Sequence, residues 1–243
     1  GTVLVSGTDL VGLSAARLRA LRGEDVSMIF QEPSSALNPV FPIWWQLGEG
    51  LRAHRPKITR KEIRAEAVRA LDSVGIPDAA ERIDRYPHEF SGGQKQRIMI
   101  AMALALGAEL IVADEPTTAL DVTVQAEILD LLREIRRRHG TSIIVITHNM
   151  GVVADLADSV AVMHHGKIIE RAGVQELFAA PREAYTKKLL AAVPHLGRDS
   201  AWTALDPAQR AALEEAAPVV VAQDLGIEDP GRLGRGPSRA AAG

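Results

Sequence analysis

Residues 88–121 of this chain, HEFSGGQKQRIMIAMALALGAELIVADEPTTALD, decide the fold, and they begin with a turn that opens a helix. Ser91 is a natural N-cap residue, because its hydroxyl can accept a hydrogen bond from a free N–H group of the first helical turn. Gly92 and Gly93 have no side chains, so a bulky anion could approach the backbone closely. The N-terminus of a helix favours phosphate. An ordinary helix cap would look the same, so this turn alone does not identify a site.

The second half of the stretch is a short apolar strand that ends in two acidic residues. Leu110–Ala113 (LIVA) is followed at once by Asp114 and Glu115. Two neighbouring carboxylates at the end of a strand suit a metal ion and a water molecule, although a solvated strand end has the same appearance. Together with the turn at Ser91, they predict a site for a nucleoside triphosphate and its magnesium ion.

Two further polar side chains follow apolar runs elsewhere in the chain. Gln31 comes after VSMIF, and His148 comes after SIIVIT. An amphipathic helix is predicted over 122–139, and the alternation of strands with helices indicates an α/β fold with a mainly parallel sheet. Open sheets of this kind bind ligands at the carboxyl ends of their strands. Gln31 considered alone could equally well be a simple strand cap.

The composition excludes several classes of protein. Hydrophobic residues make up 47% and charged residues 24%, which is ordinary for a globular domain. The net charge of -3 gives no general attraction to nucleic acid. The absence of cysteine excludes disulfides, thiolate metal sites and iron–sulfur clusters. The longest apolar tract, 98–113, is interrupted by Gly107 and Glu109 and is too short for a transmembrane helix, so we expect any membrane contact to go through a partner.

The pattern of residues along the sequence divides the chain into a core and further segments. The core has alternating strands and helices, an inserted subdomain has helical periodicity, and the end is rich in Ala, Pro, Gly and Arg. The predicted parts are the core at 1–42 and 88–172, the helical subdomain at 43–87, a helical extension at 173–197 and a linker or tail at 198–243.

The helical subdomain carries one clear start signal and one open question. Thr59 followed by Glu62 fits a capping box at the start of a helix. Trp44 and Trp45 fit either the packing of this subdomain or an exposed surface that docks a partner.

The motifs, in this order, resemble those of the ATP-binding subunits of ABC transporters, over about residues 1–195. FSGGQKQR is similar to the family's signature motif, LIVADEP to its Walker B strand and glutamate, and TALD to its D-loop. The phrases MIFQEPSSALNP, YPHEFSGGQKQR, ADEPTTALDVTVQ and PREAYTKKLLAAVPHLG are most similar to the oligopeptide/dipeptide/nickel importer subfamily. The resemblance implies a P-loop NTPase-like fold with an inserted helical subdomain.

The resemblance also implies a role for each residue that serves ATP on its own subunit. Asp114 would hold Mg²⁺, and Glu115 would act as the general base or orient the attacking water. His148, at the position of the switch histidine, would contact the γ-phosphate. Gln31, at the position of the Q-loop, would sense the metal and the water and relay movement to the helical subdomain.

A second set of residues would serve ATP on another subunit. Ser91, Gly92, Gly93 and Gln94 would bind the γ-phosphate of ATP held by a partner, and Asp121 would help to fasten the interface. Two such subunits would therefore share each site head to tail.

One required motif of the family has no match in these 243 residues. A phosphate-binding loop of the form G-x-x-x-x-G-K-[ST] is expected, but the only Gly-Lys pair, Gly166 and Lys167, is followed by Ile168. We therefore expect the chain to be a piece that is truncated before Gly1. At the other end, PVVVAQDLGI at 218–227 could open a second ATP-binding domain or belong to a low-complexity tail.

The sequence thus favours one function and leaves two alternatives open. The favoured function is an ATP-hydrolysing subunit of an importer of peptides or nickel, peripheral on the cytoplasmic face of the membrane. Its partners would be a second ATPase subunit, transmembrane permeases and, indirectly, a solute-binding protein, with no nucleic acid. The alternatives are a non-catalytic fragment and an ABC ATPase without a transport role.

The missing loop leads to a direct prediction about nucleotide affinity. Because the principal cradle for the β- and γ-phosphates is absent, we expect the isolated chain to bind MgATP weakly or not at all in a calorimetric titration. A dissociation constant in the micromolar range would contradict this prediction.

Overall fold

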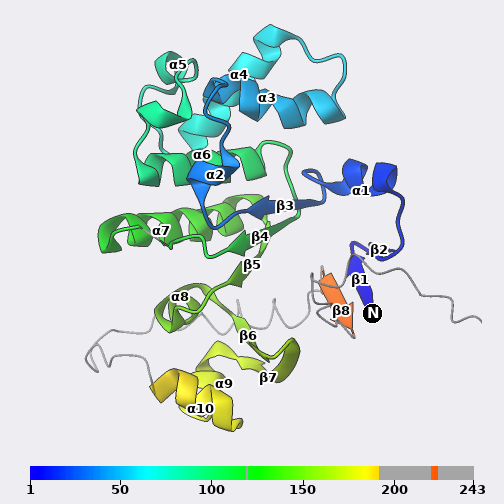
Figure 1. The fold of residues 1–243 in the computed structure, drawn as a ribbon, viewed down its shortest axis with the longest axis vertical. Helices are drawn as coiled ribbons and strands as arrows, with labels where there is room; N and C mark the ends of the chain where they lie inside the picture. Colours follow the sequence, from blue (N-terminus) through cyan, green and yellow to red (C-terminus); the bar gives the residue numbers. More distant parts are fainter. Residues whose placement is uncertain (119, 192–219, 224–243) are drawn as a thin grey trace, which may run out of the picture.

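The computed structural model describes residues 1–118, 120–191 and 220–223. Within these ranges the strands form three sheets, and helices lie beside them (Figure 1). The strands are β1 (Thr2–Val5), β2 (Thr8–Asp9), β3 (Val26–Ile29), β4 (Leu110–Asp114), β5 (Ser142–Ile146), β6 (Ser159–His164), β7 (Lys167–Gly173) and β8 (Val220–Gln223). The helices are α1 (Ala15–Leu21), α2 (Pro33–Ala36), α3 (Ile43–His54), α4 (Arg60–Ser73), α5 (Ala79–Arg82), η1 (Pro87–Glu89), α6 (Gly92–Leu104), α7 (Val122–His139), α8 (Met150–Leu156), α9 (Val174–Ala179) and α10 (Ala184–Ala191).

The sheet that positions the predicted site is parallel and has the order β3-β4-β5. Ile29 of β3 lies opposite Ala113 of β4, which in turn lies opposite Val145 of β5. The strands predicted from VSMIF, LIVA and SIIVIT are therefore confirmed as three neighbours. The predicted helix at 122–139 is confirmed as α7, and the helix predicted to open after Ser91 is confirmed as α6.

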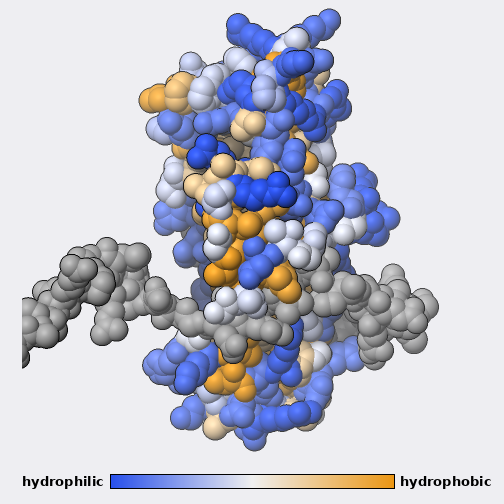
Figure 2. Space-filling view, turned by 90° about the vertical axis from the view of Figure 1, so that its right-hand side faces the viewer, coloured by the Kyte–Doolittle hydropathy of each residue, from blue (hydrophilic) through white to orange (hydrophobic). Residues whose placement is uncertain are grey.

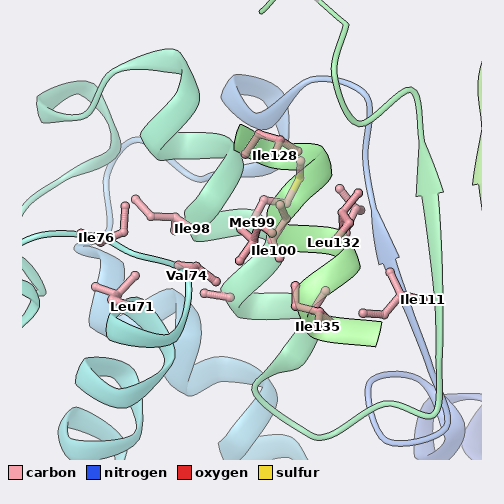
Figure 3. Close-up of a cluster of buried hydrophobic side chains, with 14 of the residues drawn as sticks. Leu71, Val74, Ile76, Ile98, Met99, Ile100, Ile111, Ile128, Leu132 and Ile135 are labelled. Atoms are coloured by element: carbon pink, nitrogen blue, oxygen red, sulfur yellow. The ribbon is translucent and has the colours of Figure 1, made fainter. Parts of the chain in front are cut away.

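Helices cover one face of this parallel sheet, and the main core lies between the two layers. Side chains of β4, α6 and α7 meet those from the end of α4 and from the segment that follows it, and most of them are fully buried (Figure 3). The labelled members of this cluster are Leu71, Val74, Ile76, Ile98, Met99, Ile100, Ile111, Ile128, Leu132 and Ile135. Burial of each such side chain contributes roughly 1.5–3 kcal/mol, so this contact fixes the positions of α6 and α7 on the sheet.

The opposite face of the parallel sheet carries apolar side chains that remain exposed. Met28 lies in β3 and Phe30 lies just beyond it, two residues later, and their exposed fractions are 41% and 50%. Ile144 and Ile146 are spaced in the same way in β5, with 41% and 50%. Because neighbouring positions in a strand face opposite sides, this face is distinct from the one that carries Ile29. Apolar residues also gather at mid-height on the side of the molecule drawn in Figure 2.

The helices α3, α4 and α5 gather at one end of the molecule (Figure 1). They are joined to the rest by the shared apolar core and by a few polar contacts. Arg97 of α6 donates to the carbonyl oxygen of Val74 at 2.7 Å and forms an ion pair with Glu127 of α7 at 2.9 Å. His54, at the end of α3, lies 2.9 Å from the carbonyl oxygen of Arg22. The boundaries 1–42, 43–87, 88–172 and 173–197 remain a prediction.

The start of α4 and the two tryptophans have the local structure expected for packing within this helical part. Thr59 and Glu62 form the predicted capping box. Trp44 is half-buried under the guanidinium groups of Arg60 and Arg64, and Trp45 stacks on Phe41 with the ring centroids 4.0 Å apart.

The other two sheets are antiparallel. β6 and β7 form a hairpin, and β1 pairs with β2 on one side and with β8 on the other. Residues 220–223 of the segment 218–227 form β8, while the remainder of the predicted linker or tail at 198–243 lies outside the described residues. No helix within the described part of the chain is both long enough and apolar enough to cross a bilayer.

A buried carboxylate ties α10 to the β6–β7 hairpin. Glu170 of β7 accepts hydrogen bonds from the backbone N–H groups of Arg182 at 2.7 Å and Glu183 at 3.1 Å, just before α10. The Thr186 hydroxyl and these N–H groups hold the pKa of Glu170 below its ordinary value, against the opposing effect of burial.

This lowered pKa predicts a pH-dependent contribution to stability. A carboxylate whose pKa is lower in the folded state stabilises the fold above its unfolded pKa, near about 4.3, and loses this contribution as the pH falls through the folded pKa. We expect Glu170→Gln to unfold at a lower temperature than the wild type at about pH 7, and the difference to shrink below about pH 4. Thermal unfolding followed by circular dichroism at several pH values measures the difference in unfolding temperature between the variant and the wild type.

Glu183→Gln is the matched control, because it removes a neighbouring charge from an exposed side chain. A stability difference for Glu170→Gln that did not change with pH, or an equal effect of Glu183→Gln, would contradict the assignment.

Candidate nucleotide site

The topology brings the predicted site residues to one edge of the parallel sheet. Gln31 follows β3, Asp114 and Glu115 end β4, and His148 follows β5. The helix α7 joins β4 to its parallel neighbour β5, so its N-terminus lies at the carboxyl edge of the strands. The C-terminal end of α6 leads to the start of β4, so the N-terminus of α6 lies toward the same carboxyl edge (Figure 1). Ser91 and Asp121, the N-caps of these two helices, therefore also face this edge.

Glu115 and His148 are joined directly. The carboxylate oxygen Oε1 of Glu115 lies 2.5 Å from Nδ1 of His148 and accepts the backbone N–H of His148 at 3.0 Å. The side chain of Glu115 is 16% exposed, whereas that of His148 is 81% exposed. The pair thus combines a sheltered carboxylate with an imidazole ring that faces solvent.

The backbone of Glu115 is held in an unusual conformation. Its φ angle of 45° lies in the left-handed region, which is uncommon for residues other than glycine. Its N–H donates to the carbonyl oxygen of Ile146 at 2.8 Å, one step beyond the last paired residues of β4 and β5. Such strain costs about 1–3 kcal/mol and persists only where surrounding contacts impose it.

Two threonine hydroxyls hold the other oxygen of the same carboxylate. Oε2 of Glu115 accepts from Oγ1 of Thr118 at 2.9 Å and from Oγ1 of Thr147 at 3.3 Å. Thr118 opens the TALD stretch that resembles the D-loop, but no contact of either threonine with Glu115 was predicted from the sequence. Their positions, three residues after Glu115 and immediately before His148, are the only signal that could have indicated them.

The protonation state of Glu115 follows from these contacts. Burial raises the pKa of this carboxyl. The hydrogen bonds from the His148 ring, the Thr118 hydroxyl and the His148 N–H lower the pKa, and because their combined effect is larger than that of burial, the pKa of Glu115 lies below its ordinary value. Glu115 is therefore ionised near neutral pH, and Nδ1 of His148 donates its hydrogen to Oε1. This leaves Nε2 as the ring nitrogen that is available to a ligand.

The N-terminus of α6 has the predicted cap. Ser91 Oγ accepts the N–H of Gln94 at 3.3 Å, and Gln94 Oε1 accepts the N–H of Ser91 at 3.2 Å, which makes a reciprocal capping box. Gly92 is exposed, and a Cβ atom added there would meet nothing within 4 Å. The turn therefore leaves open space over its backbone.

Gly93 has a different role, because it sets the distance between α6 and α7. A Cβ atom at Gly93 would come within 2.6 Å of Cγ1 of Val124. Val124 also donates its N–H to the side chain of Asp121 at 2.9 Å, so this contact joins the first turns of both helices. The periodicity of the helix at 122–139 places Val124 on its apolar face, but the contact between Val124 and Gly93 was not predicted from the sequence.

The structure thus forms two groups of site residues rather than one. Glu115 and His148 form the first, at the ends of β4 and β5. Ser91–Gln94 and Asp121 form the second, at the starts of α6 and α7. Within the described residues, no hydrogen bond or ion pair joins the two groups. Gln31 and Asp114 are at the same edge of the sheet, and within the part of the chain that the structure describes no hydrogen bond or ion pair joins the side chain of either residue to Glu115.

The available ligands fit magnesium only in the company of a nucleotide. In the ranges that the structure describes, no three His, Cys, Asp or Glu side chains are grouped so that they could hold a metal ion. Mg²⁺ is usually bound by one or two carboxylates together with phosphate oxygens and water. Asp114, half-buried at the end of β4, fits such a shared site.

A parallel sheet with carboxylates and helix N-termini at its carboxyl edge is typical of α/β domains that bind nucleotides. Comparisons with known proteins lead to the family of this chain. The family model described as ABC transporter matches residues 1–118. The solved structure of cbiO1 from Clostridium perfringens, described as part of the ABC transporter complex cbiONQ, is 30% identical with a TM-score of 0.62, over 73% of this chain and 67% of that chain. The chain belongs to the ABC transporter family, and the predicted fold class is confirmed.

Curated relatives agree with the subfamily that the motifs resemble. The glutathione import ATP-binding protein GsiA of Pectobacterium atrosepticum is 54% identical over 189 residues, which cover 78% of this chain and 30% of that protein. The dipeptide transport ATP-binding protein DppD of Bacillus subtilis is 50% identical over 201 residues, which cover 83% of this chain and 60% of that protein. The chain thus spans only 30% to 60% of the length of these two relatives.

The two glycines of the α6 cap give a matched pair for mutagenesis. Gly93→Ala places a methyl group against Val124, so we expect it to lower the free energy of unfolding by about 1–3 kcal/mol, the usual cost of overpacking. Gly92→Ala enters open space and should be neutral or stabilise by up to about 1 kcal/mol. Urea titration measures both changes.

Val124→Ala supplies the second half of the test. In the Gly93→Ala background it should recover much of the loss, because it removes the methyl group that the new Cβ atom meets. Equal effects of the two glycine substitutions would show that Gly93 does not set the helix spacing.

Proposed function

We propose that this chain is an ATP-binding and ATP-hydrolysing subunit of an ABC importer. The imported solute would be a peptide, a class that includes glutathione, or nickel. One observation carries the proposal: an ionised Glu115 is paired with the exposed ring of His148, next to Asp114, at the sheet edge that the α6 N-terminus also faces. The printed functions of the relatives, glutathione import and dipeptide transport, support the solute class.

The residues at the ends of the strands would carry out hydrolysis of ATP to ADP and phosphate. Glu115 would orient the attacking water and accept its proton, and Gln31 would contact the same water and the metal. Magnesium, held by Asp114, would neutralise charge on the phosphate oxygens. The ring of His148, which is 81% exposed, would contact the γ-phosphate.

The residues at the starts of α6 and α7 would serve a second subunit. Gly92 and Gly93 present free N–H groups at the start of a helix whose dipole favours anions. Together with Ser91 and Gln94, which form the capping box, they would bind the γ-phosphate of ATP held by a partner. Asp121 would help to hold that interface. The separation of these residues from the Glu115 network supports two half-sites, each completed by another ATPase subunit.

Transport would require further partners. We propose that the chain lies peripherally on the cytoplasmic face of the membrane, where the part formed by α3–α5 would pass movement to transmembrane permeases. A solute-binding protein would act with it indirectly.

Mapping by NMR tests whether nucleotide engages these two groups. In the ¹⁵N-labelled chain titrated with ATP, we expect the amide signals of Gly92–Gln94 to shift in the millimolar range. Signals of Asp114, Glu115 and His148 should shift only when Mg²⁺ is present. Gly92→Asp should abolish the first response, because its charge repels phosphate while an acid at a helix N-terminus keeps the helix stable.

Asp114→Asn is the reciprocal variant and should abolish only the Mg²⁺-dependent response. No response at either group, or shifts that adenosine without phosphates reproduces, would contradict the proposed function.

A further inference from the structure

All the hydrogen-bonding capacity of the Glu115 carboxylate is in use. An ionised carboxylate has about four lone-pair positions, and in this structure it meets the His148 N–H, the His148 ring, the Thr118 hydroxyl and the Thr147 hydroxyl. The two donors from His148 share Oε1, and the two threonines share Oε2. The two oxygens are thus held by different kinds of partner.

The two hydroxyls reach Oε2 from independent segments. Thr118 lies in the turn that follows β4, and its backbone N–H donates to the carbonyl oxygen of Glu115 at 3.1 Å. Thr147 follows β5, and its Oγ1 accepts the N–H of Asn149 at 3.1 Å. Because Asn149 occupies a lone pair of the Thr147 hydroxyl, the hydrogen of that hydroxyl remains free to point at Glu115.

Exposure separates the donors into fixed and movable ones. The His148 side chain is 81% exposed, and its ring can leave the carboxylate by rotation. Thr118 and Thr147 are both partly buried, and each is tied to neighbouring backbone. When the ring moves away, Oε1 gains a free lone pair, while Oε2 keeps both hydroxyls.

We propose that Thr118 and Thr147 are positioning residues that fix Oε2 of Glu115 and so determine that Oε1 is the working oxygen. The hydroxyls keep the carboxylate from rotating about its last bond when the His148 ring departs. The further step, that the freed Oε1 receives the attacking water, rests on the proposed function. Neither threonine touches the water or the phosphate in this assignment.

Paired substitutions separate the hydroxyls from the rest of the threonine side chain. Valine has the shape of threonine without its hydroxyl, and serine keeps the hydroxyl without the methyl group. In Thr118→Val/Thr147→Val we expect the His148 backbone amide to exchange its hydrogen about fivefold faster, a factor typical of one lost hydrogen bond. The ¹⁵N signal of His148 Nδ1 should move toward that of a free histidine ring.

The serine pair, Thr118→Ser/Thr147→Ser, should keep both wild-type values. Thr141→Val is a matched control, since it removes a buried hydroxyl that donates to the carbonyl oxygen of Ala108 and is not bonded to Glu115. Wild-type behaviour of the valine pair, or an equal change in the serine pair or in Thr141→Val, would overturn the proposal.

These measurements need neither nucleotide nor turnover. They decide the role of the two hydroxyls even if the titration with MgATP fails, and a failure of that titration would count against the proposed function alone.

Discussion

The parallel pairing of β4 with β3 on one side and β5 on the other is the constraint on which the rest of the structure depends. Residues that are far apart in the chain reach one edge because all three strands run in the same direction and end at nearly the same level. The pairing continues past Asp114 through the bond from Glu115 N–H to Ile146. That bond places Glu115 beside His148, so the geometry of the chemical pair is a consequence of strand register.

The packing of α6 and α7 sets the second part of the site in the same way. Both helices bury apolar side chains against one face of the sheet, and their first turns meet where Gly93 accommodates Val124. The caps at Ser91 and Asp121 therefore occupy fixed places at the same edge as the carboxylates. Neither cap needs a direct contact with Glu115, because the shared core holds both groups.

The three parallel strands are mainly apolar along their whole length, although helices cover only one face of the sheet in the described chain. Parallel sheets are normally buried on both faces, and their strands are apolar throughout rather than alternating. VSMIF, LIVA and SIIVI have this composition, although Met28, Phe30, Ile144 and Ile146 are exposed in the described chain. The apolar runs therefore predict strands correctly but do not predict which face the helices cover.

The sequence by itself determined the elements, and it predicted the candidate site residues that the structure brings to one edge of the sheet. Apolar runs, helical periodicity and local caps such as Ser91 with Gln94 depend on neighbours within a few residues, and these signals are present in any single sequence. The tertiary structure alone decided the roles of Thr118, Thr147 and Val124, as well as the left-handed backbone of Glu115. Each of these depends on a partner on another element, and strand register and helix spacing bring the partners together. The Thr147 hydroxyl, 32 residues away in the chain, can donate a hydrogen bond to Glu115 only because β4 and β5 lie side by side.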